Sequence, residues 1–220
     1  MDRTREYFDE ISGKWEEMRQ AFFGDGVRRA AIAAAGVKPG FVVADVGIGS
    51  GFIAEAALDA GARVIGIDNS SGMLAEVARR FAGRPFEPRS GEADLLPLAD
   101  GEVDAVLANM FLHHAPDPPA SIREMARALK SGGTLVITDA DSHEHEWLRT
   151  EQHDRWLGFN RAEIGSWFRD AGLEDVAVGD TQEICSPTSE CGVKAAITIF
   201  LARGRKPGPE RAPRVERTLP

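Results

Sequence analysis

A short apolar run that ends in a glycine-rich turn is the feature that most constrains this chain. Residues 41–46 (FVVADV) are rich in β-branched and apolar side chains, and residues 47–51 (GIGSG) follow with a glycine at every second position. Glycine lets a backbone turn tightly and lets a ligand approach without a Cβ in the way. Residues 52–60 then have a helical composition that ends at Gly61. The sequence therefore predicts a strand, a ligand-binding turn and a helix in direct succession.

The same alternation of strands and helices continues along the chain. Periodicity and turn residues predict strands at 63–67, 103–109, 134–138, 173–178 and 195–201, and helices at 71–81, 120–129 and 161–171. Strands and helices that alternate form right-handed βαβ units and a parallel sheet covered on both faces. We expect an α/β fold with a doubly wound, mostly parallel sheet, in which residues 195–201 close one edge as an antiparallel strand.

Three segments lie outside this alternation. Residues 1–36 are expected to form an N-terminal helical lid, with helices around 4–19 and 26–35. The main domain is expected at 37–203, and its residues 140–160 form a polar, histidine-rich insertion. Residues 204–220 are rich in proline and basic side chains, so we expect a flexible tail.

Composition and charge exclude several classes of protein. The chain has 220 residues, of which 43% are hydrophobic, and a net charge of −9. It contains no apolar run near the about 18 residues of a membrane span, and its two cysteines are too few for a disulfide framework. Binding to nucleic acid needs a basic face. We therefore expect a cytoplasmic protein with a small-molecule substrate and neither a membrane nor a nucleic-acid partner.

Acidic residues around the turn indicate which ligand it binds. Asp68 ends the second predicted strand, where its carboxylate can accept hydrogen bonds from both hydroxyls of a ribose. Asp45 lies two residues before the first glycine, where a negative charge disfavours a pyrophosphate and suits a cation. Phe52 occupies the position of the third glycine in a dinucleotide-binding turn. These three residues favour a nucleoside that carries sulfonium and ammonium groups.

From about residue 5 to residue 203 the chain resembles the class I S-adenosylmethionine-dependent methyltransferases. Its DVGIGSG turn matches the family's DxGxGxG motif, and the resemblance implies S-adenosylmethionine as the cofactor and a seven-stranded Rossmann-like sheet. It also implies that the glycine turn holds the methionine part, Asp68 the ribose, and residues 93–95 the adenine edge. The implied cofactor-binding residues are Trp15, Asp45, Gly47, Ile48, Gly49, Gly51, Asp68, Asn69, Met73, Ala93, Asp94, Leu95, Asn109 and Met110.

Other segments resemble particular branches of this family. His114 followed by Asp117 and Pro118, with Tyr7, Phe8 and Trp15 near the N-terminus, is similar to the small-molecule branch that includes ubiquinone-type and arsenite-type methyltransferases. Residues 141–147 and 156–159 resemble methyltransferases associated with ArsR-type regulators. The resemblance implies in-line transfer of a methyl group to a small-molecule acceptor. Neither the acceptor nor the oligomeric state can be read from the sequence.

Histidines and cysteines supply the remaining candidates. His114, and after it His113, could act as a general base, or one could pack under the sheet while the other caps a loop. The acidic and histidine residues of 139–153 include metal-ligand types, but we expect a solvated insertion and no metal site. Cys185 and Cys191 could bind a thiophilic species, although unpaired cysteines are more often inert.

Two other functions remain open. An NAD(P)-dependent oxidoreductase would share the strand–turn–helix layout, but the Tyr-x-x-x-Lys pair of short-chain reductases is absent, since the only tyrosine is Tyr7. A protein that binds S-adenosylmethionine without turnover is the other alternative. Its mark would be tight binding of the cofactor with no methyl transfer.

Overall fold

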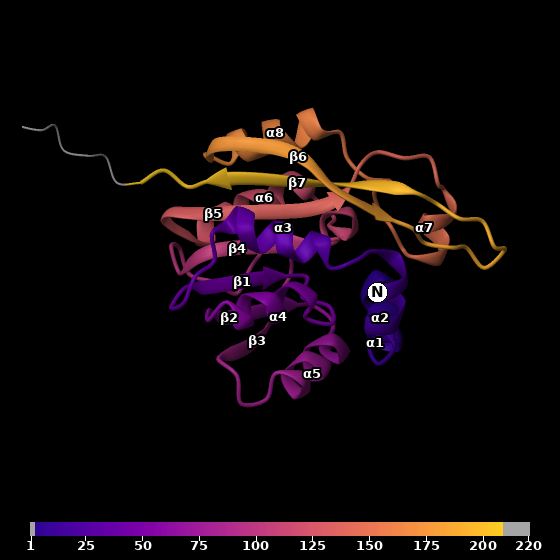
Figure 1. Cartoon of the computed structure of the whole chain (residues 1–220), viewed down its shortest axis with the longest axis horizontal. Coiled ribbons are helices and arrows are strands. Elements are labelled where there is room, and N and C mark those ends of the chain that lie inside the picture. Colours follow the sequence, from indigo (N-terminus) through magenta and orange to yellow (C-terminus); the bar gives the residue numbers. More distant parts are fainter. Residues whose placement is uncertain (1–2, 209–220) are drawn as a thin grey trace, which may run out of the picture.

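The computed structural model describes residues 3–208, which fold into a seven-stranded sheet with helices on both faces (Figure 1). The strands are β1 (Val42–Val46), β2 (Arg63–Asp68), β3 (Phe86–Ser90), β4 (Val103–Asn109), β5 (Leu129–Ala140), β6 (Glu174–Cys185) and β7 (Ile197–Arg205). Their order across the sheet is β3-β2-β1-β4-β5-β7-β6. The first five are parallel, and β7 is antiparallel to both β5 and β6. The predicted α/β class and the mostly parallel, doubly wound sheet are confirmed.

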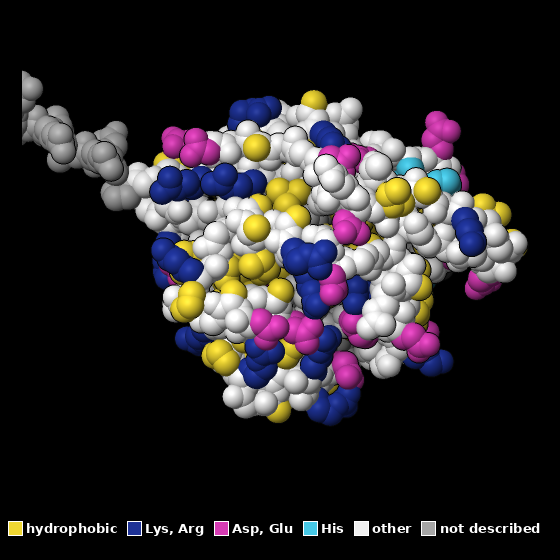
Figure 2. All heavy atoms as spheres, viewed as in Figure 1, with side chains coloured by type: hydrophobic (Ala, Val, Ile, Leu, Met, Phe, Trp, Pro, Cys, Tyr) yellow, Lys and Arg dark blue, Asp and Glu magenta, His cyan; other side chains and the backbone are white. Residues whose placement is uncertain are grey.

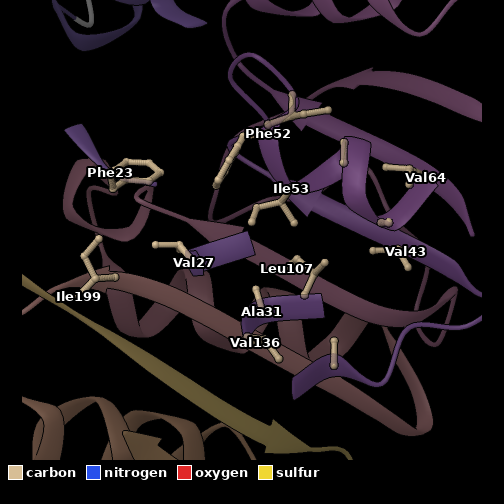
Figure 3. Close-up of a cluster of buried hydrophobic side chains, with 14 of the residues drawn as sticks. Phe23, Val27, Ala31, Val43, Phe52, Ile53, Val64, Leu107, Val136 and Ile199 are labelled. Atoms are coloured by element: carbon tan, nitrogen blue, oxygen red, sulfur yellow. The ribbon is translucent and has the colours of Figure 1, made fainter. Parts of the chain in front are cut away.

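Two hydrophobic layers hold the helices to the sheet. The helices are α1 (Arg3–Ile11), α2 (Trp15–Phe22), α3 (Gly26–Ala35), α4 (Phe52–Asp59), α5 (Ser71–Arg80), α6 (Pro118–Ala128), α7 (Trp147–Glu151) and α8 (Arg161–Asp170), with a 3-10 helix η1 (Leu112–His114). Side chains alternate along each strand, so Val43 and Val64 face α3 and α4 (Figure 3). Their neighbours Ala44 and Ile65 join the layer of α6 and α8 on the other face.

The strand order places a crevice beside β1. This strand pairs with β2 on one side and with β4 on the other, so the connections leaving β1 and β4 lead to opposite faces of the sheet. In open α/β sheets, ligands bind at such a switch point, beyond the carboxyl ends of the strands. Figure 1 shows α1 and α2 at this end of the sheet, apart from the helices that cover its faces. We call α1 and α2, residues 3–22, the lid helices.

Two predictions about the sheet are wrong. The strand β3 was not expected, because its sequence FEPRS lacks the apolar pattern of a buried strand; it forms an edge, where only one neighbour is needed. Residues 195–201 were expected to close an edge, yet β7 lies between β5 and β6. The edge strand on that side is β6, whose residues are mostly exposed or half-buried, as an edge permits.

The described residues of the N-terminal segment 1–36 form three helices with different surroundings. The predicted helix 4–19 is interrupted by a turn at residues 12–14, where Lys14 N–H donates to the carbonyl oxygen of Ile11. The predicted helix 26–35 is α3, and it belongs to the core because Val27 and Ala31 are buried against the sheet. An alanine-rich helix with one apolar stripe packs closely on a sheet.

The insertion and the tail also differ from the predicted bounds. Within 140–160, Asp141 forms a bridge with Phe159, and the short helix α7 lies between them. The tail was expected to begin at Gly204, but Gly204 and Arg205 are the last residues of β7 and pair with β5. These two residues pair with Leu135 and Thr134 of β5 as part of the antiparallel strand pair, so the sheet extends to Arg205. Residues 209–220 lie outside the described part of the chain.

The surface carries charges of both signs. Figure 2 shows Lys and Arg side chains mixed with Asp and Glu over the face drawn. Several of them pair across elements, such as Arg28 and Arg80 with Glu55, at 2.9 Å each. Between residues 3 and 208, no helix has the length and hydrophobicity needed to span a membrane.

We expect Leu107→Ala to destabilise the protein by about 2–5 kcal/mol, because Leu107 lies in the middle of β4 and is only 1% exposed. The matched control is Leu95→Ala, at a residue that is 75% exposed, and its cost should be below about 0.5 kcal/mol. Urea denaturation followed by circular dichroism measures both. An equal loss of unfolding free energy in the two variants would contradict the burial of Leu107 in the core.

Candidate active site

A pocket opens at the carboxyl ends of β1, β2 and β4, beneath the lid helices; we call it the main pocket. Eleven of the predicted site residues contribute to its wall, and they come from the lid, the glycine turn, α5 and the ends of β2 and β4. They are Trp15, Gly47, Ile48, Gly49, Asp68, Asn69, Met73, Ala93, Asn109, Met110 and His114. The structure therefore brings together candidates that are up to 99 positions apart in the sequence (15 to 114).

Five predicted site residues do not line the main pocket. Asp45 is buried beneath the turn, and Gly51 lies at the start of α4, where a Cβ would come within 2.5 Å of the Phe81 ring. Asp94 and Leu95 are exposed, because the bridge between Glu92 and Leu95 turns this segment outward. In this segment Gly91, Glu92 and Leu96 line the pocket with Ala93, and the assignment of residues 93–95 to the adenine edge stays a prediction. The fifth residue, His113, lines an adjoining pocket.

Two carboxylates support the glycine turn, Asp45 fully buried and Asp68 half-buried at the pocket wall. Asp45 accepts a hydrogen bond from Ala54 N–H at 2.9 Å, at the start of α4. Asp68 accepts from Gly49 N–H at 3.1 Å and from Ser70 N–H at 2.9 Å. Burial raises the pKa of Asp45 well above its usual value and the pKa of Asp68 to about 6, although the backbone N–H donors favour the charged forms.

The turn needs glycine at two positions for steric reasons. Gly47 has φ +68° and Gly49 has φ +50°, in the left-handed region. A Cβ at Gly47 would lie 2.1 Å from the Phe111 ring, and one at Gly49 would lie 2.9 Å from Nε1 of Trp15. The aromatic rings thus occupy the space that these glycines leave, and they bring the lid and the β4 exit against the turn.

Hydrogen bonds tie the lid helices to the start of α5 and to the glycine turn. Asp9 accepts from the Ser70 hydroxyl at 2.6 Å and from Gly72 N–H at 3.0 Å. Glu16 accepts from the Ser50 hydroxyl at 2.5 Å and pairs with Arg19 at 2.7 Å. The lid therefore closes the main pocket through charged and hydroxyl groups on both sides of the turn.

Sequence reasoning missed several residues of the main pocket. Arg19 is buried, its guanidinium lies 3.9 Å from the centre of the Phe52 ring, and both residues line the pocket. Phe8 and Phe111 also line it. One signal was available for Arg19: it follows Trp15 by four positions, so the two share a face of α2.

A second pocket adjoins the main pocket. The two share Phe8, Trp15, Phe23, Met110 and His114. The other walls of the second pocket are mostly apolar, with a few polar groups from the insertion and from β6: they are Phe22, His113, Ala140, His143, Leu148, Gln152, Asp154, Trp156, Gly158, Cys185, Pro187 and Ile197. The lid aromatics and His114 thus lie between a cavity of mixed polarity and a largely apolar one.

Two adjacent histidines that line the second pocket, His113 and His114, differ in charge. His113 Nδ1 lies 2.7 Å from Asp139 Oδ1, and its Nε2 lies 3.7 Å from Asp154 Oδ1. Burial opposes its charge, but Asp139 and Asp154 outweigh burial and raise the pKa of His113 to about 9. His114 is held neutral, because burial and the neighbouring His113 lower its pKa well below the usual value. Its Nδ1 lies 3.3 Å from the carbonyl oxygen of His153.

The remaining candidates are placed separately. Cys185 is buried in the second pocket, where burial raises its thiol pKa to about 12, whereas Cys191 is exposed. The metal-ligand types of residues 139–153 do not gather around one point: in the described part of the chain, the group close enough to share an ion is His113, His114 and Asp154.

Comparisons with known proteins agree with this geometry. Residues 44–137 match a family described as a methyltransferase domain. The chain is 33% identical over 141 residues to a demethylmenaquinone methyltransferase of Renibacterium salmoninarum, which covers 63% of this chain and 59% of that one. It is 26% identical to the demethylmenaquinone methyltransferase of Desulfitobacterium hafniense, over 93% of this chain and 90% of that one.

A solved structure shares the fold over nearly its whole length. It is a putative methyltransferase of Haloferax volcanii, in complex with the Trm112 methyltransferase activator; the TM-score is 0.75 at 27% identity, over 91% of this chain and 97% of that one. The Renibacterium protein extends well beyond the matched stretch, so its acceptor is a property of that protein. None of these three comparisons bears on the resemblance to ArsR-associated methyltransferases, which remains a prediction.

The matched domain covers the predicted cofactor motif, and the full-length fold match places that motif in the same architecture. This favours a methyltransferase over the oxidoreductase alternative. The chain is therefore similar to methyltransferases, both in the domain at residues 44–137 and in its overall fold.

Proposed function

We propose that the protein transfers the methyl group of S-adenosylmethionine to a small acceptor with a largely apolar body. The observation that carries the proposal is the pair of adjoining pockets, of which the one over the glycine turn is the more polar and the other is lined mainly by apolar side chains. They share His114 and Met110, so a donor in one and an acceptor in the other would meet at these residues.

The residues of the main pocket fit the cofactor. Asp68 is a half-buried carboxylate with acceptor capacity beyond the backbone N–H groups that it binds, as the hydroxyls of a ribose require. Gly91, Ala93 and Met73 would hold the adenine. Gly47, Gly49 and Asn109 would hold the methionine part, since glycines allow the ligand to approach the backbone. When bound, the cofactor supplies a methyl group already activated by its sulfonium.

The lid helices exclude water and position the acceptor. Phe8 and Trp15 lie on the boundary between the pockets, with ring centres 5.3 Å apart. Tyr7 donates from its hydroxyl to Gln152 at 3.3 Å, which joins the lid to the insertion. Holding a nucleophile in line with an activated methyl group is a large part of the catalysis such a reaction needs.

The second pocket favours an aromatic or quinol-like acceptor. Its walls include Phe22, Trp156 and Ile197, and its polar groups are concentrated around His114 and Asp154. An acceptor with an apolar ring and one hydroxyl or thiol matches this division. The demethylmenaquinone methyltransferases among the relatives support the same class of acceptor.

Of the two predicted catalytic histidines, we propose that His114 contacts the acceptor. Its Nδ1 faces the His153 carbonyl, so the other ring nitrogen of the neutral imidazole can accept a hydrogen bond from the acceptor's hydroxyl or thiol. His113 is charged and lies between Asp139 and Asp154. It therefore positions its neighbour and offers no base of its own.

The proposal also covers the cellular location of the protein and the kind of molecule it binds. A cytoplasmic location is supported by two free cysteines, one of them exposed. A small-molecule acceptor, with no nucleic-acid or membrane partner, is supported by the net charge of −9 and by the pocket.

Turnover with radiolabelled S-adenosylmethionine tests the proposal. The acceptor panel contains quinols, phenols, thiols and arsenite, and the readouts are labelled product and S-adenosylhomocysteine. The proposal expects methyl transfer to a ring hydroxyl or a related acceptor. Tight cofactor binding with no transfer to any member of the panel would favour a non-catalytic binding protein.

Cofactor affinity should depend on pH through Asp68. Its pKa in the free protein is about 6, and the protonated carboxyl loses acceptor capacity, so binding weakens as the pH falls. If only the ionised form binds, the dissociation constant rises about tenfold from pH 7 to pH 5. Equilibrium dialysis measures it. Asp68→Asn should bind more weakly at pH 7 and lose most of this slope; an unchanged slope would assign it to another group, such as Asp45.

Removing a lid contact should weaken use of the cofactor. Asp9→Ala deletes the acceptor for Ser70 and Gly72, and a loss of about 1 kcal/mol corresponds to about a fivefold higher KM for S-adenosylmethionine. The control is Glu10→Ala, an exposed neighbour on the same helix. Steady-state kinetics compare the two, and equal KM values would argue against a role for this contact.

His114→Ala should lower kcat by about 10–100-fold, because the acceptor loses the group that orients it. Cofactor affinity should change little, and His145→Ala, which lies outside both pockets, should retain activity. The split between kcat and the cofactor dissociation constant is the measurement. A normal kcat in His114→Ala would remove this histidine from the mechanism.

A further inference from the structure

We propose that His113, His114 and Asp154 bind one divalent transition-metal ion, of the borderline class that includes Zn²⁺ and Fe²⁺. One ligand atom from each of the three residues lies within 4.8 Å of the others. Two imidazoles and one carboxylate form a recognised ligand set for such ions. With metal–ligand bonds of about 2.0–2.2 Å, two ligands of one ion lie about 3.0–3.5 Å apart, close to the 3.7 Å between His113 Nε2 and Asp154 Oδ1.

Each imidazole is oriented by a partner at its other nitrogen. His113 Nδ1 lies 2.7 Å from Asp139 Oδ1, and His114 Nδ1 lies 3.3 Å from the His153 carbonyl oxygen. Metal-binding histidines commonly donate their second N–H to a carboxylate or a backbone carbonyl in this way. The Nε2 atom of each ring is therefore the one left for an ion.

The two groups that orient the imidazoles, Asp139 and the His153 carbonyl, are themselves held in place. Asp139 is fully buried and accepts from Leu112 N–H at 2.8 Å and from Ala140 N–H at 2.7 Å. His153 has φ +60°, a conformation that non-glycine residues seldom adopt. This conformation gives its carbonyl oxygen to His114 and places the next residue, Asp154, beside the histidine pair.

The surroundings suit a bound cation. The side chains of His113 and Asp154 are each 9% exposed, and all three proposed ligands line the second pocket, which leaves coordination positions open to that cavity. Neither lysine nor arginine lines this pocket within the described residues. Coordination would displace the proton of His113 Nε2 to solvent, and the ion's charge would replace it between Asp139 and Asp154.

The ion's use in catalysis rests on the proposed function. A divalent ion at the boundary of the two pockets would bind the acceptor's oxygen or sulfur and lower its pKa, which makes it a better nucleophile. With the ion bound, His114 Nε2 holds the metal, and the ion takes over the contact with the acceptor that the free imidazole would make. His114 lines both pockets, which places the ion near the donor.

Titration with Co²⁺ alone tests the site. The untagged full chain is freed of metal with a chelator, and visible d–d absorption reports coordination by nitrogen and oxygen. We expect one Co²⁺ per chain, displaced by Zn²⁺. His114→Ala and Asp154→Asn should weaken binding more than about tenfold, since even loss of a residue that only orients a ligand costs 10–100-fold. His145→Ala is the matched control and should bind normally. Circular dichroism confirms that each variant is folded.

Two results would overturn the proposal. One is a folded wild-type protein that shows no d–d absorption with excess Co²⁺. The other is binding that survives His114→Ala and Asp154→Asn but is lost in His145→Ala, which would place the ion elsewhere on the insertion. S-adenosylmethionine binding, measured in the same metal-free sample, tests the cofactor half separately. Failure of one measurement with success of the other therefore identifies which proposal is wrong.

Discussion

Two carboxylates under the turn between β1 and α4 determine the shape of the site. Asp45 accepts from Ala54 N–H, and Asp68 accepts from Gly49 N–H. A buried hydrogen-bonding group that loses its partner costs about 1–3 kcal/mol, so these hydrogen bonds hold the turn in one conformation. That conformation requires left-handed glycines, which in turn leave room for Trp15 from the lid and Phe111 from β4. The pocket between the lid helices and the sheet follows from this arrangement.

The cofactor half of the site could be predicted because its information is local. A strand, a glycine turn and an acidic strand end are short patterns, and the fold places strand ends together without further detail. The sequence says less where tertiary contacts decide the outcome. Leu95, predicted at the adenine edge, is exposed beside its bridge to Glu92, whereas Leu96 lines the pocket. The strand β3 was missed because FEPRS, as an edge strand, needs no apolar pattern.

The acceptor half could not be predicted, because its chemistry depends on residues far apart in the sequence. His113 and His114 are adjacent and chemically identical, yet one is charged and the other neutral. The difference arises from Asp139 at the end of β5, which lies 2.7 Å from Nδ1 of His113, and from Asp154 after α7, which lies 3.7 Å from its Nε2. For His114, burial and the charge of the neighbouring His113 lower the pKa, so this imidazole is neutral. Identical neighbours in a sequence can thus differ in function once distant segments fold against them.

The most direct test of the central claim, that the main pocket binds S-adenosylmethionine, is isothermal titration calorimetry of the full chain. The cofactor and NADH are titrated separately under the same conditions. The assignment predicts saturable binding of one S-adenosylmethionine per chain and no heat from NADH beyond dilution. Saturable binding of NADH together with no binding of S-adenosylmethionine would contradict it.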